Sequence, residues 1–227
     1  MGTLVSALIT STRRRINETS TTFHSDTDLI AYADEGQKYI VRKIRPLEAV
    51  SATTIDSTAT NPEQYAFPTD FLAVRRITLD NYDLFRTDFN EIKEAEMDTD
   101  AVAGGTGFWY EWNDTIYLYP IPSTSEDGKT LKIWYYKKPS TISASTNTLD
   151  LGTEYDDAVV CYMTYLCCVK DDLRDKADYM MQECNAKLGE IKIQRADDKI
   201  DRQPRFRMSD NLKSRDGLNA YRFRRRY

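Results

Sequence analysis

The hydrophobic periodicity of this chain changes twice, and these changes restrict the fold more than any other feature of the sequence. Apolar residues recur at helical spacing up to Pro46 and again from Tyr155 onward. Between these regions, from about Gln64 to Pro139, aromatic and β-branched residues alternate with the period of two that is typical of strands. We therefore predict an α+β protein: a helical bundle of about four helices with an inserted small antiparallel β-rich domain and an extended C-terminal arm.

The same changes suggest where the parts of the chain begin and end. We assign residues 1–63 to the N-terminal helices of the bundle and residues 64–139 to the β-rich insert. Residues 140–201 form the C-terminal helices, and residues 202–227 form a basic and aromatic arm. A length of 227 residues suits one large or two small domains.

Two helices are predicted before the insert. The first covers Thr3 to Ile16 and ends in Arg13, Arg14 and Arg15, since cations suit the negative end of the helix dipole. We interpret this triplet as a solvated helix end, with phosphate binding as the alternative. Ser25 with Asp28 three residues later resembles a helix N-terminus, and Pro46 ends that second helix.

The insert should contain several short strands. The turn between two of them is Asn113-Asp114, a second hairpin turn is expected at Asp127-Gly128, and Asp88 to Met97 should be helical. Ser51 to Pro62 is expected to be a polar linker, and Gly104 to Gly107 a flexible loop. The predicted strands are Tyr65 to Pro68, Phe71 to Leu79, Phe108 to Trp112, Thr115 to Tyr119 and Thr130 to Tyr136.

The helix that follows the insert carries apolar residues over much of its circumference. A helix of this kind needs neighbours on more than one side, from its own fold or from another subunit. Its candidate subunit-packing residues are Tyr155, Val159, Tyr162, Tyr165 and Leu166.

The residues of common catalytic sites are scarce. His24 is the only histidine, and its place in a polar linker predicts a surface residue, so nucleophile–histidine pairs are not expected. Cys161, Cys168 and Cys184 can approach one another in a bundle, but no second histidine or Cys-x-x-Cys pair supports a zinc site, and packing is favoured. Gly128-Lys129-Thr130 precedes a strand, so it lacks the helix N-terminus of a phosphate-binding loop. We expect no enzyme, no cofactor and no metal.

The composition indicates in which compartment the protein is made and whether it crosses a membrane. Hydrophobic residues make up 41% and charged residues 30%, as in soluble globular proteins. The longest nearly apolar run, Ala158 to Val169, is shorter than the ~20 residues that span a bilayer. No signal peptide is visible, and four cysteines on helical patterns read as reduced thiols of a protein made in the cytoplasm.

Charge is divided unevenly along the chain. It contains 31 basic and 36 acidic residues. From Arg202 onward, eight Arg and one Lys stand against Asp210 and Asp216, a net charge of +7, which leaves −12 for residues 1–201. An acidic body repels DNA phosphates, and a basic arm of this kind is typical of an interaction tail.

The arm ends in a segment of alternating character. Tyr221, Phe223 and Tyr227 occupy odd positions, whereas Arg222, Arg224 and Arg226 occupy even ones beside Arg225. Drawn out as a strand, the segment shows an aromatic side and a guanidinium side. It could add to the sheet edge of a folded partner, and the alternative is a solvated basic tail.

Several motifs in order resemble the head-to-tail connector, or adaptor, proteins of tailed bacteriophages. Their order and spacing, over roughly Leu29 to Leu188, carry the resemblance. The motifs are Leu29-Ile-Ala-Tyr-Ala-Asp-Glu-Gly-Gln37, Tyr65-Ala-Phe-Pro-Thr-Asp-Phe-Leu72, Trp112-Asn-Asp-Thr-Ile-Tyr-Leu-Tyr-Pro-Ile-Pro122, Leu131-Lys-Ile-Trp-Tyr-Tyr136 and Tyr155-Asp-Asp-Ala-Val-Val-Cys-Tyr162.

The resemblance implies a structural virion protein without catalytic residues. Such connectors form a ring, typically of twelve copies, beneath the portal at the capsid vertex, and they pass DNA through the centre without sequence-specific binding. Their partners are the portal protein and tail or further ring and nozzle proteins, with no membrane involved. They typically send a C-terminal arm into the portal, which here would be Tyr221 to Tyr227.

Two other functions stay open. A nucleic-acid-binding protein could grip single strands with the Arg and aromatic tail, because stacking on an aromatic ring contributes ~1–3 kcal/mol per base. A small enzyme using acidic loops would require a metal ion.

Overall fold

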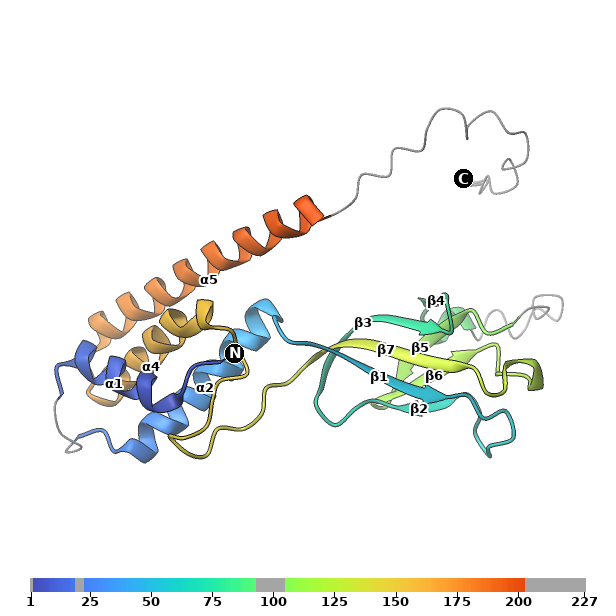
Figure 1. The fold of residues 1–227 in the computed structure, drawn as a ribbon, viewed down its shortest axis with the longest axis horizontal. Coiled ribbons are helices and arrows are strands. Elements are labelled where there is room, and N and C mark those ends of the chain that lie inside the picture. The colour runs from blue at the N-terminus through green and yellow to red at the C-terminus, as the bar shows by residue number, and fades with distance from the viewer. Residues whose placement is uncertain (1, 19–22, 93–104, 203–227) are drawn as a thin grey trace, which may run out of the picture. The chain divides into compact units, whose positions relative to one another are not determined.

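The structure is a computed structural model that describes residues 2–18, 23–92 and 105–202 of the chain. The chain divides into two units, Met1–Leu188 and Gly189–Tyr227. The first unit contains α1 (Val5–Ile16), α2 (Asp26–Ile44), α4 (Asp156–Lys170), the sheet and the first half of α5 (Arg174–Arg202). The predicted α+β class is confirmed, and Figure 1 shows its helices and strands.

Capping hydrogen bonds and residues in the left-handed conformation mark the ends of the first two helices. Ser25 caps α2 by accepting a bond of 3.1 Å from the Asp28 N–H, while the Asp28 carboxylate accepts from the Ser25 N–H, so the predicted helix start is confirmed. Arg45 closes the same helix with a left-handed φ of 54°, directly before Pro46. At the end of α1, Asn17 plays the same part with a φ of 58°.

The helices α1, α2 and α4 pack against one another. Their interior is apolar, and Leu8, Ile40 and Val159 are almost fully buried. Gly36 allows α2 to approach α4, because a Cβ there would lie 3.3 Å from Cδ1 of Tyr162. The predicted bundle of four helices is not confirmed, since α5 continues from the first unit into the second.

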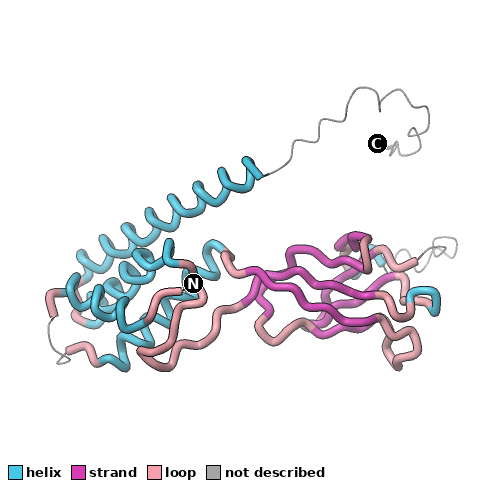
Figure 2. Tube along the Cα trace, in the orientation of Figure 1, coloured by secondary structure: helices cyan, strands magenta, loops and turns pink. Residues whose placement is uncertain are grey.

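In the described part of the chain, seven strands form one sheet in the order β1-β7-β3-β4-β5-β6-β2. All neighbours are antiparallel except β4 and β5, which pair in parallel over Phe85–Phe108 and Arg86–Trp109. The sheet is therefore mixed, which corrects the antiparallel prediction. Figure 2 shows the strands gathered in one part of the chain. The bounds are β1 (Glu48–Thr54), β2 (Gln64–Ala66), β3 (Phe71–Leu79), β4 (Tyr82–Arg86), β5 (Phe108–Trp112), β6 (Thr115–Tyr119) and β7 (Thr130–Lys137).

Five of these strands agree with the predicted ones, and two differ from the expectation. The linker predicted for Ser51 to Pro62 is wrong over its first four residues, which belong to β1. That strand is held by complete pairing with β7, from Glu48–Tyr136 to Thr54–Thr130, rather than by apolar alternation of its own. The strand β4 was not expected, because only Leu84 at its centre is buried.

One face of the curled sheet encloses a separate apolar core. Side chains from five strands and from Ile55 meet there, and none of them is more than 7% exposed. The members are Ile55, Ile77, Leu79, Leu84, Trp109, Ile116, Leu118, Leu131, Ile133 and Tyr135.

The turns of the insert were predicted unequally well. Asn113 and Asp114 both have positive φ, 49° and 55°, and join β5 to β6 in two residues as expected. Asp127-Gly128 is a turn, with φ of 77° at Gly128, but it is not a hairpin, because β6 and β7 are not neighbours in the sheet. Residues 89–92 are helical, and the rest of the helix predicted over Asp88 to Met97 lies outside the described residues.

Candidate partner-binding surfaces

The five residues predicted to pack against other subunits fall into two groups. Tyr155, Val159 and Tyr162 are buried in the first unit, at 2%, 0% and 6% exposure, whereas Tyr165 and Leu166 are half-buried. Burial within one chain therefore accounts for the apolar character of the first three. Subunit packing by these residues stays a prediction.

An aromatic cluster surrounds Tyr162. Its ring stacks on Tyr39 with centroids 4.6 Å apart and meets Tyr165 at 5.7 Å. Its hydroxyl donates to Glu35 at 3.3 Å, and burial, followed by this carboxylate, raises its pKa well above the usual range. Tyr39 in turn donates to Asn185 of α5 at 3.0 Å, so the cluster links α2, α4 and α5.

The outer side of the sheet carries an aromatic surface that the sequence reasoning did not single out. It consists of Phe85, Phe89, Phe108, Tyr110, Trp112 and Tyr117. Phe89 packs on Trp112 and Tyr110, with centroids 5.1 and 5.8 Å away, and Tyr110 stacks on Tyr117 at 5.0 Å.

Several rings of this surface are open to solvent. Phe85 is 67% exposed and Trp112 56% exposed, and exposed aromatic residues are enriched where proteins meet partners. The signal in the sequence was Phe108-Trp109-Tyr110 in β5, where aromatic residues occupy both faces of one strand.

A second outer feature is an arginine groove of about 360 Å³ between β3 and β4, lined by residues 74–77, residues 83–86 and Trp109. Arg76 pairs with Asp83 at 2.6 Å and lies over the ring of Trp134, while Arg86 lies over the ring of Trp109 at 5.4 Å. Each arginine already has a carboxylate partner, so the groove has no large excess of positive charge to attract phosphate.

The arginine triplet lies in the last turn of α1 as predicted, but two of its three side chains are not the solvated ones that we expected. Arg13 lies 3.2 Å from Glu18 and 2.8 Å from Asp26, and it donates to the carbonyl of His24. Arg15 donates to the thiol of Cys161 at 3.0 Å and pairs with Glu183. Only Arg14 of the three is exposed, so Arg13 and Arg15, rather than the whole triplet, join α1 to its neighbours in the first unit.

The prediction of a surface position for His24 is wrong. Its side chain is 2% exposed, and its Nε2 lies 3.3 Å from Oδ2 of Asp171, at the end of α4. Its backbone N–H donates to Glu18, so His24 itself is held inward although Phe23 beside it is 74% exposed. The linker composition gave no sign of this contact, because Asp171 is 147 positions away.

The cysteines pack in the interior as expected. All four are free and buried, and burial raises the pKa of Cys167 and of Cys184 to about 12. Among the described residues, no group of three or more His, Cys, Asp or Glu side chains is arranged to hold a metal ion. No helix in the described part of the chain has the length and apolarity needed to cross a membrane.

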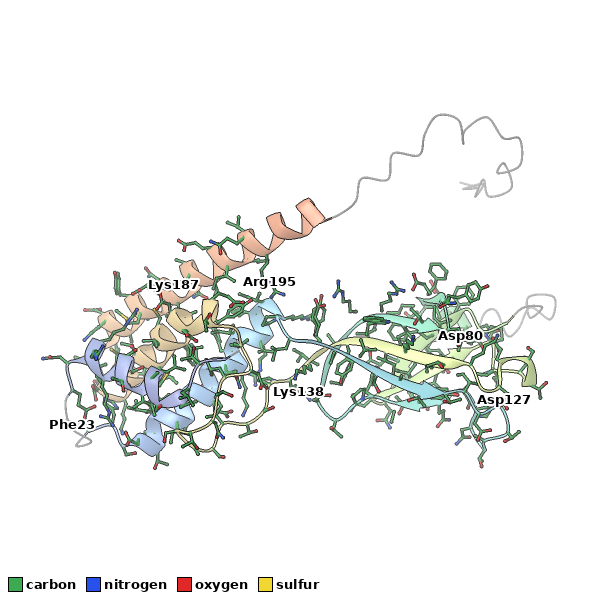
Figure 3. All side chains as sticks on the ribbon, in the orientation of Figure 1. Phe23, Asp80, Asp127, Lys138, Lys187 and Arg195 are labelled. Atoms are coloured by element: carbon green, nitrogen blue, oxygen red, sulfur yellow. The ribbon has the colours of Figure 1, made fainter. Side chains whose placement is uncertain are left out.

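The predicted docking residues of the arm, Tyr221, Arg222, Phe223, Arg224, Arg225, Arg226 and Tyr227, lie outside the described residues. Their role stays a prediction. What the structure does describe is α5, which leads to the arm as a continuous helix up to Arg202. In the first unit that helix is attached by Lys187, labelled in Figure 3, whose ammonium lies 3.2 Å from Asp157.

These features define an α+β protein that presents aromatic and arginine side chains on its sheet. Comparison with protein families supports this class and makes it specific. The family model described as SU10 adaptor protein matches residues 3–209, which is most of the chain. The chain therefore belongs to the SU10 adaptor protein family, whose members are phage head-to-tail adaptors. No curated protein matches the chain.

Membership confirms the resemblance and supports a structural role in the virion. An adaptor of this kind interacts with portal and tail proteins. A structural adaptor role agrees with the expectation of a protein that is not an enzyme.

Proposed function

We propose that this adaptor forms a ring at the portal vertex, docks onto the portal through its C-terminal arm and bridges the portal to the tail. The observation that carries the proposal is the division of charge, −12 over residues 1–201 and +7 over the rest. The family match ends at residue 209, so the alternating segment Tyr221 to Tyr227 lies beyond it. The adaptor role thus rests on the family, and the docking mode rests on this chain's own residues.

The arm has the pattern of a strand that is completed by a partner. Aromatic side chains at 221, 223 and 227 would lie on one side and the arginines at 222, 224 and 226 on the other. An edge strand of the portal would supply main-chain hydrogen bonds, and alternate side chains would supply specificity. In a ring, each arm that docks makes the next docking effectively intramolecular, so several weak contacts add up to a stable joint.

The acidic body suits a ring around DNA. Several copies of a body with a net charge of −12 would repel the phosphates of the passing duplex. Repulsion would keep DNA from adhering to the channel during packaging and ejection. Twelve copies are proposed from the resemblance, with the DNA passing through their centre.

Subunit packing is proposed for the half-buried part of α4. Tyr165 and Leu166 would contact the neighbouring copy, and Tyr155, Val159 and Tyr162 would support that surface from the interior. Apolar side chains at such a position are typical of the centre of an interface.

The test is binding to the portal of the same genome. A chain truncated after Gln203 should keep the unfolding temperature of the full chain and lose portal binding, measured by co-sedimentation and electron microscopy. A triple variant that replaces Tyr221, Phe223 and Tyr227 by Ser should lose binding as well, because the aromatic side would meet the portal. A matched control replaces Ser209, Ser214 and Asn219 of the same arm by Ala and should bind normally.

Retention of full affinity by the truncated chain would refute arm docking. A protein that ignores the portal and binds single-stranded DNA through the arm at low salt would instead favour the nucleic-acid function.

A further inference from the structure

The second half of α5, residues 189–202, carries an apolar stripe. Gly189, Ile193, Ala196 and Ile200 follow one another four, three and four residues apart, which places them on one side of the helix. Ile193 is 64% exposed, and a Cβ built at Gly189 would meet no atom within 4 Å. The part of this stripe from Gly189 to Ala196 is therefore exposed.

The stripe is distinct from the buried side of the same helix. Cys184, Leu188 and Ile191 are 0%, 5% and 9% exposed. At about 100° per residue, they fall on the side of α5 nearly opposite to Gly189 and Ile193. The helix therefore has two apolar sides, and only one of them is buried.

Opposite charges flank the open stripe. By helical position, Glu190, Asp197 and Asp201 follow one edge of the stripe, whereas Lys192 and Lys199 follow the other. In the lettering of a heptad repeat with Ile193 at position a, the acidic residues at 190 and 197 occupy e and the basic residues at 192 and 199 occupy g. Pairs between g and e positions are those that join neighbouring parallel helices.

We infer that residues 189–202 pack in parallel against the same segment of a neighbouring copy, with the basic edge of one helix against the acidic edge of the next. The inference rests on the ring of the proposed function and names one of its contacts. A helix with one acidic and one basic edge complements an identical helix in the same orientation. Because each copy offers both edges, the contact is heterologous and can repeat around a closed ring.

The length and net charge of residues 189–202 are consistent with the same segment of a second copy as the partner. Its 14 residues form a helix about 21 Å long, or two heptads, which is marginal alone and adequate as one contact of a larger ring. It contains four acidic and four basic residues, so its net charge of zero does not favour DNA as the partner.

Charge reversal on full-length chains tests the inference. One variant carries Lys192→Glu and Lys199→Glu, which makes both edges acidic, and a second carries Glu190→Lys and Asp197→Lys, which makes both basic. Each alone should need about tenfold more protein than the wild type for half-assembly, measured by light scattering and electron microscopy, because like charges would face each other. Mixed in equal amounts, the two variants should regain wild-type assembly by alternating around the ring.

A matched control reverses Arg174 and Lys176, which are exposed in the first half of the same helix, and should assemble as the wild type does. If the wild type forms rings and both charge-reversal variants assemble as well as it does, this contact is refuted, whereas the proposed ring itself is not. Failure of the mixture to assemble while each variant keeps its native helix content would refute the contact as well. A wild-type chain that stays monomeric with and without the portal would overturn the ring of the proposed function itself.

Discussion

At the scale of single residues, two thiols of the helical interior show how burial controls chemistry. Cys167 of α4 and Cys184 of α5 are both fully buried, and the Cys184 thiol donates to the carbonyl of Ala158 at 3.5 Å. Burial is the first cause that raises the pKa of each to about 12. The thiolate is the reactive form, so these cysteines should be inert in the folded protein.

We predict that at pH 8 the native chain reacts with a thiol-specific disulfide reagent at least about a hundredfold more slowly than the unfolded chain. An exposed cysteine introduced as Thr146→Cys is the control and should react at once. Because the folded pKa lies above the unfolded value, the stabilisation by protonated thiols is complete below about pH 9 and declines as pH rises toward about 12. Rapid labelling of Cys167 in native protein, detected by mass spectrometry, would contradict this assignment.

At the scale of elements, the join between β5 and β6 depends on two residues in the left-handed region. Asn113 and Asp114 adopt φ of 49° and 55° without the freedom of glycine. The turn they form matches the twist of the strands it connects, which pair from Phe108–Tyr119 to Trp112–Thr115. The strain of this turn is borne by residues with short polar side chains, which tolerate it best.

We predict that Asp114→Gly raises the free energy of unfolding by about 0.5–1 kcal/mol, because glycine adopts this conformation without a Cβ penalty. Asp114→Ala should lower the free energy of unfolding by a similar amount. Because both variants remove the carboxylate, the difference between them reports the backbone effect alone. Chemical denaturation of both variants measures the difference. Equal stability of the two variants would mean that the turn is not the strained element described above.

At the scale of the whole molecule, the distribution of charge makes portal docking and DNA binding distinguishable by their salt dependence. The arm carries +7 and the body −12, so any affinity for DNA must come from the arm. Docking of an arm into a sheet edge relies on main-chain hydrogen bonds and aromatic contacts, which salt affects less than phosphate contacts.

We predict that raising salt from about 50 to 200 mM weakens portal binding less than tenfold, whereas binding to a single-stranded oligonucleotide falls by about three hundredfold if the arm contacts six phosphates. The measurement is a pair of fluorescence titrations on the same full-length protein. A chain truncated after Gln203 is the control and should bind neither partner. Equal salt sensitivity for both partners would contradict strand-like docking.

Patterns within a few residues of one another determined much of this protein from the sequence alone. The period of 3.6 residues predicted α1, α2 and α4, and the period of two predicted five of the strands. Ser25 with Asp28, and Asn113 with Asp114, marked a helix start and a turn because their hydrogen bonds and dihedral angles are local. The order of such motifs carried the resemblance to phage adaptors, which the family match over residues 3–209 confirms.

Contacts between distant residues were decided only by the tertiary structure. The pairing of β1 with β7, the inward fold of His24 toward Asp171 and the parallel step between β4 and β5 leave no periodic trace in the sequence. Gln37 shows the reason: it is fully buried among apolar neighbours of α2, yet its amide donates to Ser140 and accepts from Asp150, more than a hundred positions away. A polar group is buried where the folded chain supplies its hydrogen-bond partners, and those partners are known only once the chain has folded.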